Sequence, residues 1–120
     1  MDRRETLPGD DINSGAMVPA APVRLAELVD YVPGAVVSRT LAKSDAGTLT
    51  VFAFDAGEEL SEHTAPFDAY VQSLDGTVEL TIDGSPVHPA VGETVLMPAK
   101  IPHAVKAVER FKMLLILIRG

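Results

Sequence analysis

The sequence predicts an all-β domain whose strands close into a barrel. Short segments rich in β-branched and aromatic residues follow one another from residue 35 to the C-terminus. Gly, Asp and Pro separate these segments every ~8–12 residues, the spacing of short strands in sandwiches and barrels. Apolar and polar side chains alternate along them, as in strands with one buried face. A chain of 120 residues can hold one such domain and is too short for two.

The N-terminal part carries a weaker signal. Residues 1–22 are polar and then rich in Ala and Pro, which predicts a mobile arm, and Met17 is an alternative start to Met1. Residues 23–34 hold apolar side chains at helical spacing, but Val-Pro-Gly at the end stops the pattern. We expect a single helical turn or a strand there, and one domain over residues 23–120.

A hairpin opens the barrel. Residues 35–44 and 48–57 read as strands on either side of Asp45-Ala46-Gly47, a turn with suitable residues. Alternation in the second strand predicts two faces, one with Thr48, Thr50, Phe52 and Phe54 and the other with Leu49, Val51 and Ala53.

The remainder of the chain is also β in character. Residues 69–99 predict three short strands, separated by turns at Asp75-Gly76, 83–86 and 91–93. Residues 103–119 close the chain with one or two strands. In this last segment Leu114, Ile116 and Ile118 alternate with Met113, Leu115 and Leu117, so both faces are apolar. We expect a second copy in a homodimer to cover the outer face, and the alternative cover is the segment around residues 25–32.

Two histidine motifs resemble those of the cupin superfamily over residues 35–118. The first runs from Gly57 through five residues to His63-Thr64-Ala65, then to Ala69 and Gly76. The second runs from Gly92 through five residues to Pro98-Ala99-Lys100, then to His103 and Ala107. The resemblance, to small single-domain cupins of the cupin_2 type, implies a double-stranded β-helix, or jelly-roll, barrel with degenerate metal-binding motifs.

In that family two histidines and a glutamate of the first motif and one histidine of the second hold a divalent metal. Here Ala65 and Ala69 stand at the second histidine and the glutamate, Ala107 stands at the asparagine, and Lys100 replaces a glycine. His63 and His103 remain. The resemblance therefore implies a reduced site that holds one divalent ion, Zn, Ni, Fe or Mn, or holds none.

The same substitutions indicate a small-molecule site. Alanines remove bulk and charge from the interior, which leaves an apolar cavity with two imidazoles. We expect a ligand to contact His63, His103, Ala65, Ala69 and Ala107. Asp68 falls on the opposite face of its strand by alternation. His88 lies between turn residues, where we expect an exposed side chain.

Three functions stay open, and no catalytic residue is assigned. The first, which we predict from the sequence, is a small-molecule-binding protein with the two-histidine site. The second is a metal-dependent enzyme, an isomerase, lyase or dioxygenase acting on a small organic acid or carbonyl compound. The third is a metal-free dimeric module for ligand binding or sensing. This barrel type hosts unrelated functions, so fold alone does not choose among them.

Composition excludes several other classes. The net charge of −7 argues against nucleic acid or an anionic membrane as a partner. The chain has no cysteine, so disulfides and thiolate zinc sites are excluded. The longest apolar run, residues 113–118, is far shorter than the ~20 residues of a membrane helix. The first residues lack the apolar core of a signal peptide, so we expect a cytoplasmic protein.

Overall fold

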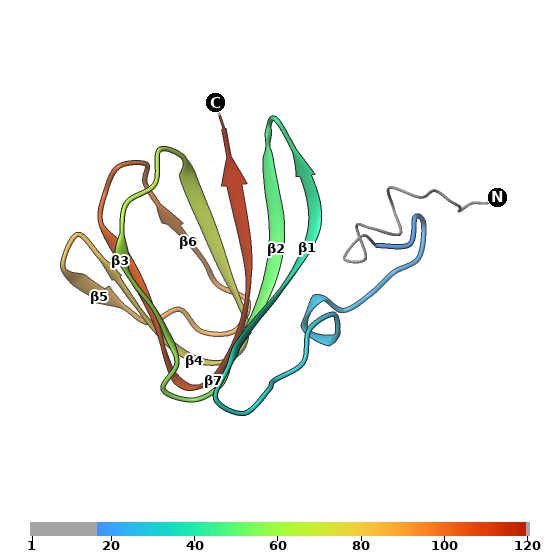
Figure 1. The fold of residues 1–120 in the computed structure, drawn as a ribbon, viewed down its shortest axis with the longest axis horizontal. Coiled ribbons are helices and arrows are strands. Elements are labelled where there is room, and N and C mark those ends of the chain that lie inside the picture. Colours follow the sequence, from blue (N-terminus) through green and yellow to red (C-terminus); the bar gives the residue numbers. More distant parts are fainter. Residues whose placement is uncertain (1–16, 120) are drawn as a thin grey trace.

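A computed structural model describes residues 17–119, and it confirms the all-β prediction (Figure 1). One 3₁₀ turn, η1 (Leu25–Glu27), precedes the barrel. The strands are β1 (Val36–Ser44), β2 (Gly47–Phe54), β3 (Glu59–His63), β4 (Asp68–Ile82), β5 (Ser85–Val87), β6 (Thr94–Met97) and β7 (His103–Ile118). Within the described residues no helix is long and apolar enough to cross a membrane.

Two long strands build both walls of the barrel. The sheet runs in the order β1-β2-β7-β4-β5, with β3 added to β7 and β6 added to β4, and all pairings are antiparallel. β4 has 15 residues and β7 has 16. Figure 1 shows both bending at the base of the cup, so that each contributes its two halves to opposite walls. The open end of the cup carries the β1–β2 turn and the ends of β3 and β7.

The predicted hairpin at residues 45–47 is confirmed, since β1 and β2 pair around a two-residue turn. The predicted turn at Asp75-Gly76 is wrong, because β4 continues through it as a bulged strand with register shifts on both sides. Gly76 has a φ of +82°, and a Cβ on it would lie 1.6 Å from the carbonyl oxygen of Arg110. Glycine at this point lets the strand bend against β7 without ending it.

The two faces predicted for β2 are also confirmed. Phe52 and Phe54 point inward with the core of the barrel, and the Phe54 ring packs 5.7 Å from that of Phe111. The buried core cluster consists of Phe54, Ala69, Val71, Val78, Leu80, Met97, Val105, Ala107, Phe111 and Met113. These side chains come from β2, β4, β6 and β7, so closing the barrel removes apolar side chains of four strands from water.

Residues 25–31, called here the strap, cover part of the outer face. Val29 is 5% exposed and packs with Val51, Ala53 and Leu114, the outward side chains of β2 and β7. The strap thus supplies one of the two predicted covers for the last strand. It reaches only part of that face, because Ile118 remains 48% exposed.

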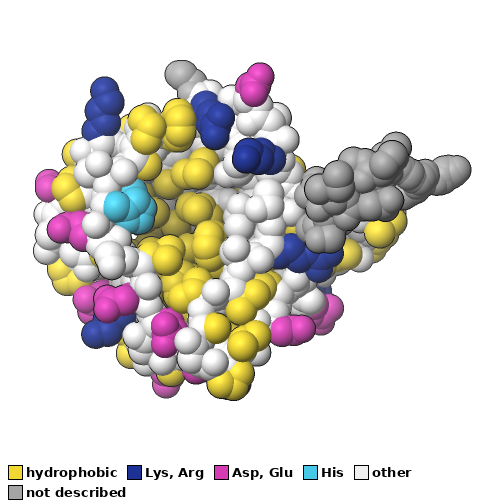
Figure 2. Space-filling model, viewed as in Figure 1, with side chains coloured by type: hydrophobic (Ala, Val, Ile, Leu, Met, Phe, Trp, Pro, Cys, Tyr) yellow, Lys and Arg dark blue, Asp and Glu magenta, His cyan; other side chains and the backbone are white. Residues whose placement is uncertain are grey.

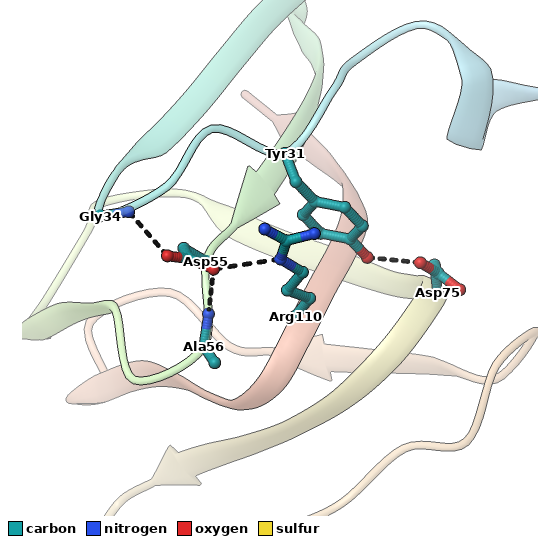
Figure 3. Close-up of polar contacts among 6 residues, drawn as sticks. All are labelled: Tyr31, Gly34, Asp55, Ala56, Asp75 and Arg110. Carbon is teal, nitrogen blue, oxygen red and sulfur yellow. Dashed lines mark hydrogen bonds and ion pairs between the residues drawn. The ribbon is translucent and has the colours of Figure 1, made fainter.

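A group of polar contacts fastens the end of the strap, and we call it the outer clasp (Figure 3). The Tyr31 hydroxyl donates to a carboxylate oxygen of Asp75. Arg110 lies 5.3 Å from the centre of the Tyr31 ring and donates from Nε to Asp55 Oδ1 at 3.2 Å. Asp55 also accepts from the backbone N–H groups of Gly34 and Ala56. The clasp joins the strap, β4 and β7 at the base of the barrel.

Candidate functional site

His63 and His103 face each other at the open end of the barrel. His63 ends β3, His103 begins β7, and the two are directly paired across the antiparallel ladder. A register shift between Leu60 and His63 brings them opposite each other. Their ring centres lie 4.3 Å apart at 70°, and the two Nε2 atoms lie 3.1 Å apart.

Backbone carbonyls orient both rings. His63 Nδ1 lies 2.8 Å from the Ser61 carbonyl oxygen, and His103 Nδ1 lies 3.1 Å from that of Ile101. A carbonyl only accepts, so each Nδ1 must carry its proton. A ring that carries no second proton then presents an unprotonated Nε2, and the two Nε2 atoms face each other. Two acceptors in this position require a shared proton or a cation between them.

Burial affects the two histidines differently. His103 is 4% exposed, whereas His63 lies at the rim and is exposed. Desolvation lowers the pKa of His103, the hydrogen bond to the Ile101 carbonyl raises it, and the nearby His63 lowers it again. The net direction is downward, so His103 is a neutral ligand-competent imidazole near pH 7.

The pair borders a hollow lined by hydrophobic side chains. Figure 2 shows a histidine at the rim of this hollow, with a wide apolar surface beyond it. Ile82 lies next to His103 in the ladder between β4 and β7, and Leu60 pairs with Val105 on the same wall. The site therefore combines two polar ring nitrogens with an apolar floor.

The three alanines of the predicted site lie in two places. Ala69 and Ala107 are buried in the core cluster, so they close the floor rather than line open space. Ala65 is half-buried in the loop after β3, and its carbonyl accepts from the Lys100 N–H at 2.7 Å. Lys100 adopts a φ of +68°, which explains why a glycine is favoured at this motif position. The structure thus brings the histidines together, with alanines around and beneath them.

Acidic side chains do not complete a ligand set. Asp68 is exposed, and its Oδ1 accepts from the Ala99 N–H at 2.9 Å, on the face that alternation predicts. His88 is also exposed, as expected, with its Nε2 3.3 Å from a carboxylate oxygen of Glu79. Across residues 17–119, no group of three or more His, Asp or Glu could hold a metal ion.

Sequence reasoning missed the two carbonyl groups that orient the rings. Ser61 and Ile101 each lie two residues before a histidine and act through the backbone. Any residue type supplies a carbonyl, so no side-chain pattern marks these positions. The only sequence signal for such a carbonyl contact is a histidine that begins or ends a strand.

A comparison with known proteins decides the family. The family profile for the cupin domain matches residues 50–118. The chain belongs to the cupin family. No curated protein matches the sequence. The first motif includes β3 and the first part of β4, and the second includes β6 and the start of β7.

Several solved structures share the fold. A conserved protein of unknown function from Streptococcus pyogenes is 39% identical over 87% of this chain and 91% of its own, with a TM-score of 0.82. A cupin superfamily protein from Desulfitobacterium hafniense is 30% identical over 87% of this chain and 95% of its own, with a TM-score of 0.82. A cupin 2 conserved barrel domain protein from Leptotrichia buccalis is 44% identical over 78% of this chain and 46% of its own, with a TM-score of 0.76.

Proposed function

We propose that this cupin binds a small organic molecule in its hollow through a divalent metal ion held by His63 and His103. The observation that carries the proposal is the 3.1 Å separation of the two Nε2 atoms, with each Nδ1 on a backbone carbonyl. Two nitrogens at metal–nitrogen distances of about 2.0–2.1 Å lie about 2.9 Å apart for right-angle coordination and about 3.3 Å apart for tetrahedral coordination. The nitrogen–nitrogen separation therefore matches that of two ligands on one ion, and each ring must tilt so that its lone pair meets the ion off the line between the nitrogens.

The hydrogen bonds that orient the two rings also support a metal site. Metal-bound histidines commonly donate their other ring N–H to a backbone carbonyl, which fixes the tautomer, and both rings do so here. Imidazole suits Zn, Ni and Fe better than Mn, which prefers oxygen donors. Two protein ligands leave several positions on the ion for water and the ligand.

The ligand class follows from the open positions and the apolar floor. A molecule with one or two oxygen donors would bind the ion, and an apolar body would fill the hollow beneath it. A small organic acid or carbonyl compound has this form. An ion held by His63 and His103 would supply Lewis-acid polarisation of the oxygen bound to it.

The test is metal binding by purified, untagged protein, measured by elemental analysis and by titration calorimetry with Zn²⁺ and Ni²⁺. We expect one ion per chain in the native protein. Replacing both histidines, His63→Ala with His103→Ala, should weaken binding at least about 100-fold, because loss of outer partners alone costs about 10–100-fold. His88→Ala is the matched control and should bind like the native protein.

Equal affinity in the double variant and in His88→Ala would show that surface groups bind the metal. That result would reject the site. Native protein that takes up no metal at either titration would also reject it.

A second candidate is acid–base chemistry without metal, as in an isomerase or lyase. The observation that favours it is the same short contact, since one proton between two Nε2 atoms makes one ring a donor and the other an acceptor. Native protein that binds no metal but shows an imidazole N–H signal shared by the two rings in ¹⁵N NMR would support this candidate instead.

A further inference from the structure

A basic side chain faces inward on the wall of the barrel that does not carry the histidines. Leu117 of β7 pairs with Ala69 of β4 on one side and with Thr48 of β2 on the other. Ala69 and Leu117 pack in the inner core, and directly paired residues share a face, so Thr48 also points inward. Lys43 of β1 pairs with Thr48 and therefore lies on this inner face as well.

A second basic side chain lies above Leu117 at the mouth of the barrel. Arg119 follows Leu117 by two residues and Phe67 precedes Ala69 by two, so alternation places both on the inner face. The Arg119 N–H donates to the Ala46 carbonyl at 2.8 Å, which continues the pairing of β7 with β2. The guanidinium carbon of Arg119 lies 5.0 Å from the centre of the Phe67 ring. The two side chains thus form a stacked pair at the rim.

Charge is sorted between the two faces of the sheet. The sequence has 17 acidic and 10 basic residues, so a random placement would favour carboxylates inside. Along the paired strands of residues 36–118, however, no Asp or Glu is paired with an inward-facing residue. Lys43 is the only Lys or Arg among those paired inward positions, and Arg119 lies just beyond them. A cleft whose charged groups share one sign attracts ligands of the opposite sign.

The guanidinium of Arg119 has no carboxylate partner within residues 17–119. The ion pairs in that part of the chain join Arg110 to Asp55 and His88 to Glu79. Arg119 and Lys43 are both exposed, so a ligand can reach them. An arginine stacked on an aromatic ring keeps the N–H groups at its edge free, and that edge matches the two oxygens of a carboxylate.

The histidine pair lies on the opposite wall of the hollow. β4 and β7 bend at the base, so the end of β4 and the start of β7 form one wall, and their other halves form the second (Figure 1). His103 pairs with Ile82 on the first wall, whereas Arg119 follows the end of β7 on the second. Figure 2 shows Lys or Arg side chains along the upper rim of the hollow and a histidine at its left. Facing sheets lie about 10 Å apart, so a molecule of a few carbon atoms can reach both walls.

We propose that Arg119, stacked on Phe67 and assisted by Lys43, anchors a carboxylate of the bound molecule. The ligand is then an organic acid with two polar ends joined by a short apolar chain. One end supplies oxygen donors to the ion at the histidine pair, and the other supplies a carboxylate to Arg119. The metal-bound end rests on the proposed function, whereas the anchor itself does not need the ion.

The test compares dicarboxylates with monocarboxylates of the same carbon number, from succinate and butyrate to pimelate and heptanoate, by titration calorimetry of Ni²⁺-loaded protein. We expect at least one dicarboxylate to bind about tenfold or more tightly than its partner, because charge-assisted bidentate pairs are the strong ones. Arg119→Gln should lower this preference to about threefold or less and leave the affinity for Ni²⁺ unchanged, while Arg119→Lys, which keeps the charge without the planar fork, should lower it less.

Lys106→Gln is the matched control. Lys106 is exposed and pairs with Glu59 and Glu79, so it lies on the outer face. This variant loses the same positive charge as Arg119→Gln and should keep the full preference for the dicarboxylate. An equal loss of preference in the two variants would show a general effect of net charge and would overturn the anchor.

A measurement on metal-free protein separates the anchor from the ion. In chelator-treated, ¹⁵N-labelled protein, glutarate should shift the NMR signal of the Arg119 Nε–H group along a saturable curve. The corresponding signal of Arg110, which donates to Asp55 in the outer clasp, should not move.

The two experiments distinguish failure of the anchor from failure of the metal site. If the native protein binds Ni²⁺ but shows the same preference as Arg119→Gln, the anchor is wrong and the proposed function stands. If the native protein binds no metal, the proposed function fails, and the NMR titration decides the anchor alone. A saturable shift of the Arg119 signal would then support it, and no shift would overturn it.

Discussion

The histidine pair and the outer clasp are two polar groups at opposite ends of the same barrel, and they differ in how their atoms are satisfied. In the clasp every contact joins a donor to an acceptor, as between Arg110 and Asp55 or between Tyr31 and Asp75. In the pair two acceptor nitrogens lie 3.1 Å apart. A satisfied network stabilises the fold, whereas two facing acceptors prepare a place for a proton or a cation.

This difference predicts separate consequences for substitutions in the two regions. Changes near the clasp should lower stability and leave the proposed metal binding intact, because the clasp lies at the base and the pair lies at the mouth. Changes in the pair should abolish metal binding with little loss of stability. A variant that alters both stability and metal binding would show that the two ends of the barrel are mechanically coupled.

The largest expected effect on stability comes from Gly76→Ala. A Cβ at this position would lie 1.6 Å from the Arg110 carbonyl oxygen, so β4 and β7 must move apart between Asp75 and Arg110 of the clasp. We expect a loss of about 4 kcal/mol in the free energy of unfolding, through backbone strain and lost clasp contacts. Urea unfolding measures it.

Gly84→Ala is the matched control for that variant. Gly84 also has a positive φ, +80°, but nothing lies within 4 Å of the added Cβ. Conformational strain alone then costs about 1 kcal/mol. Equal losses of unfolding free energy in the two alanine variants would mean that the close approach of β4 to β7 at the clasp adds nothing to the cost of the positive φ.

A smaller loss is expected from Val29→Ala in the strap. Its side chain is buried against Val51, Ala53 and Leu114, so removal of two methyl groups and the resulting gap should cost about 2 kcal/mol. Val108→Ala, at an exposed position, should change stability by less than about 0.5 kcal/mol. If Val29→Ala weakened metal binding as well, the two regions would not be independent.

The smallest expected effect is the dependence of stability on pH. The histidine pair and the outer clasp should each lose stability over a different pH range. Burial holds the folded-state pKa of His103 below its ordinary value of 6.5. The unfolded chain therefore takes up this proton first, and stability is lost as pH falls below 6.5. Hydrogen bonds from Gly34, Arg110 and Ala56 hold the pKa of Asp55 below 3.8, so its contribution is lost only below that pH.

Urea midpoints of chelator-treated protein between pH 7.5 and pH 3 test both windows. His103→Gln should flatten the loss below pH 6.5, and Asp55→Asn should flatten the loss below pH 3.8. A native protein whose midpoint rises between pH 6.5 and pH 5 would contradict the assignment of a lowered pKa to His103.

Much of the fold could be predicted because it depends on local patterns. Alternation along residues 48–54 assigned the two faces of β2 correctly, and Asp45-Ala46 forms the expected turn. The same reasoning failed at Asp75-Gly76, where a turn sequence lies inside a strand. Glycine with a positive φ fits either structure locally, and only the pairing of β4 with β7 decides between them.

The histidine spacing and the alanines around it were determined by the sequence alone, since they depend only on residue identity and order. The sequence also required some cover for the apolar outer face of the last strand. Tertiary structure decided that the strap covers only its lower part, and that His63 and His103 are cross-strand neighbours with both Nδ1 atoms on carbonyls. These outcomes depend on register and on backbone groups, which side-chain identity does not encode.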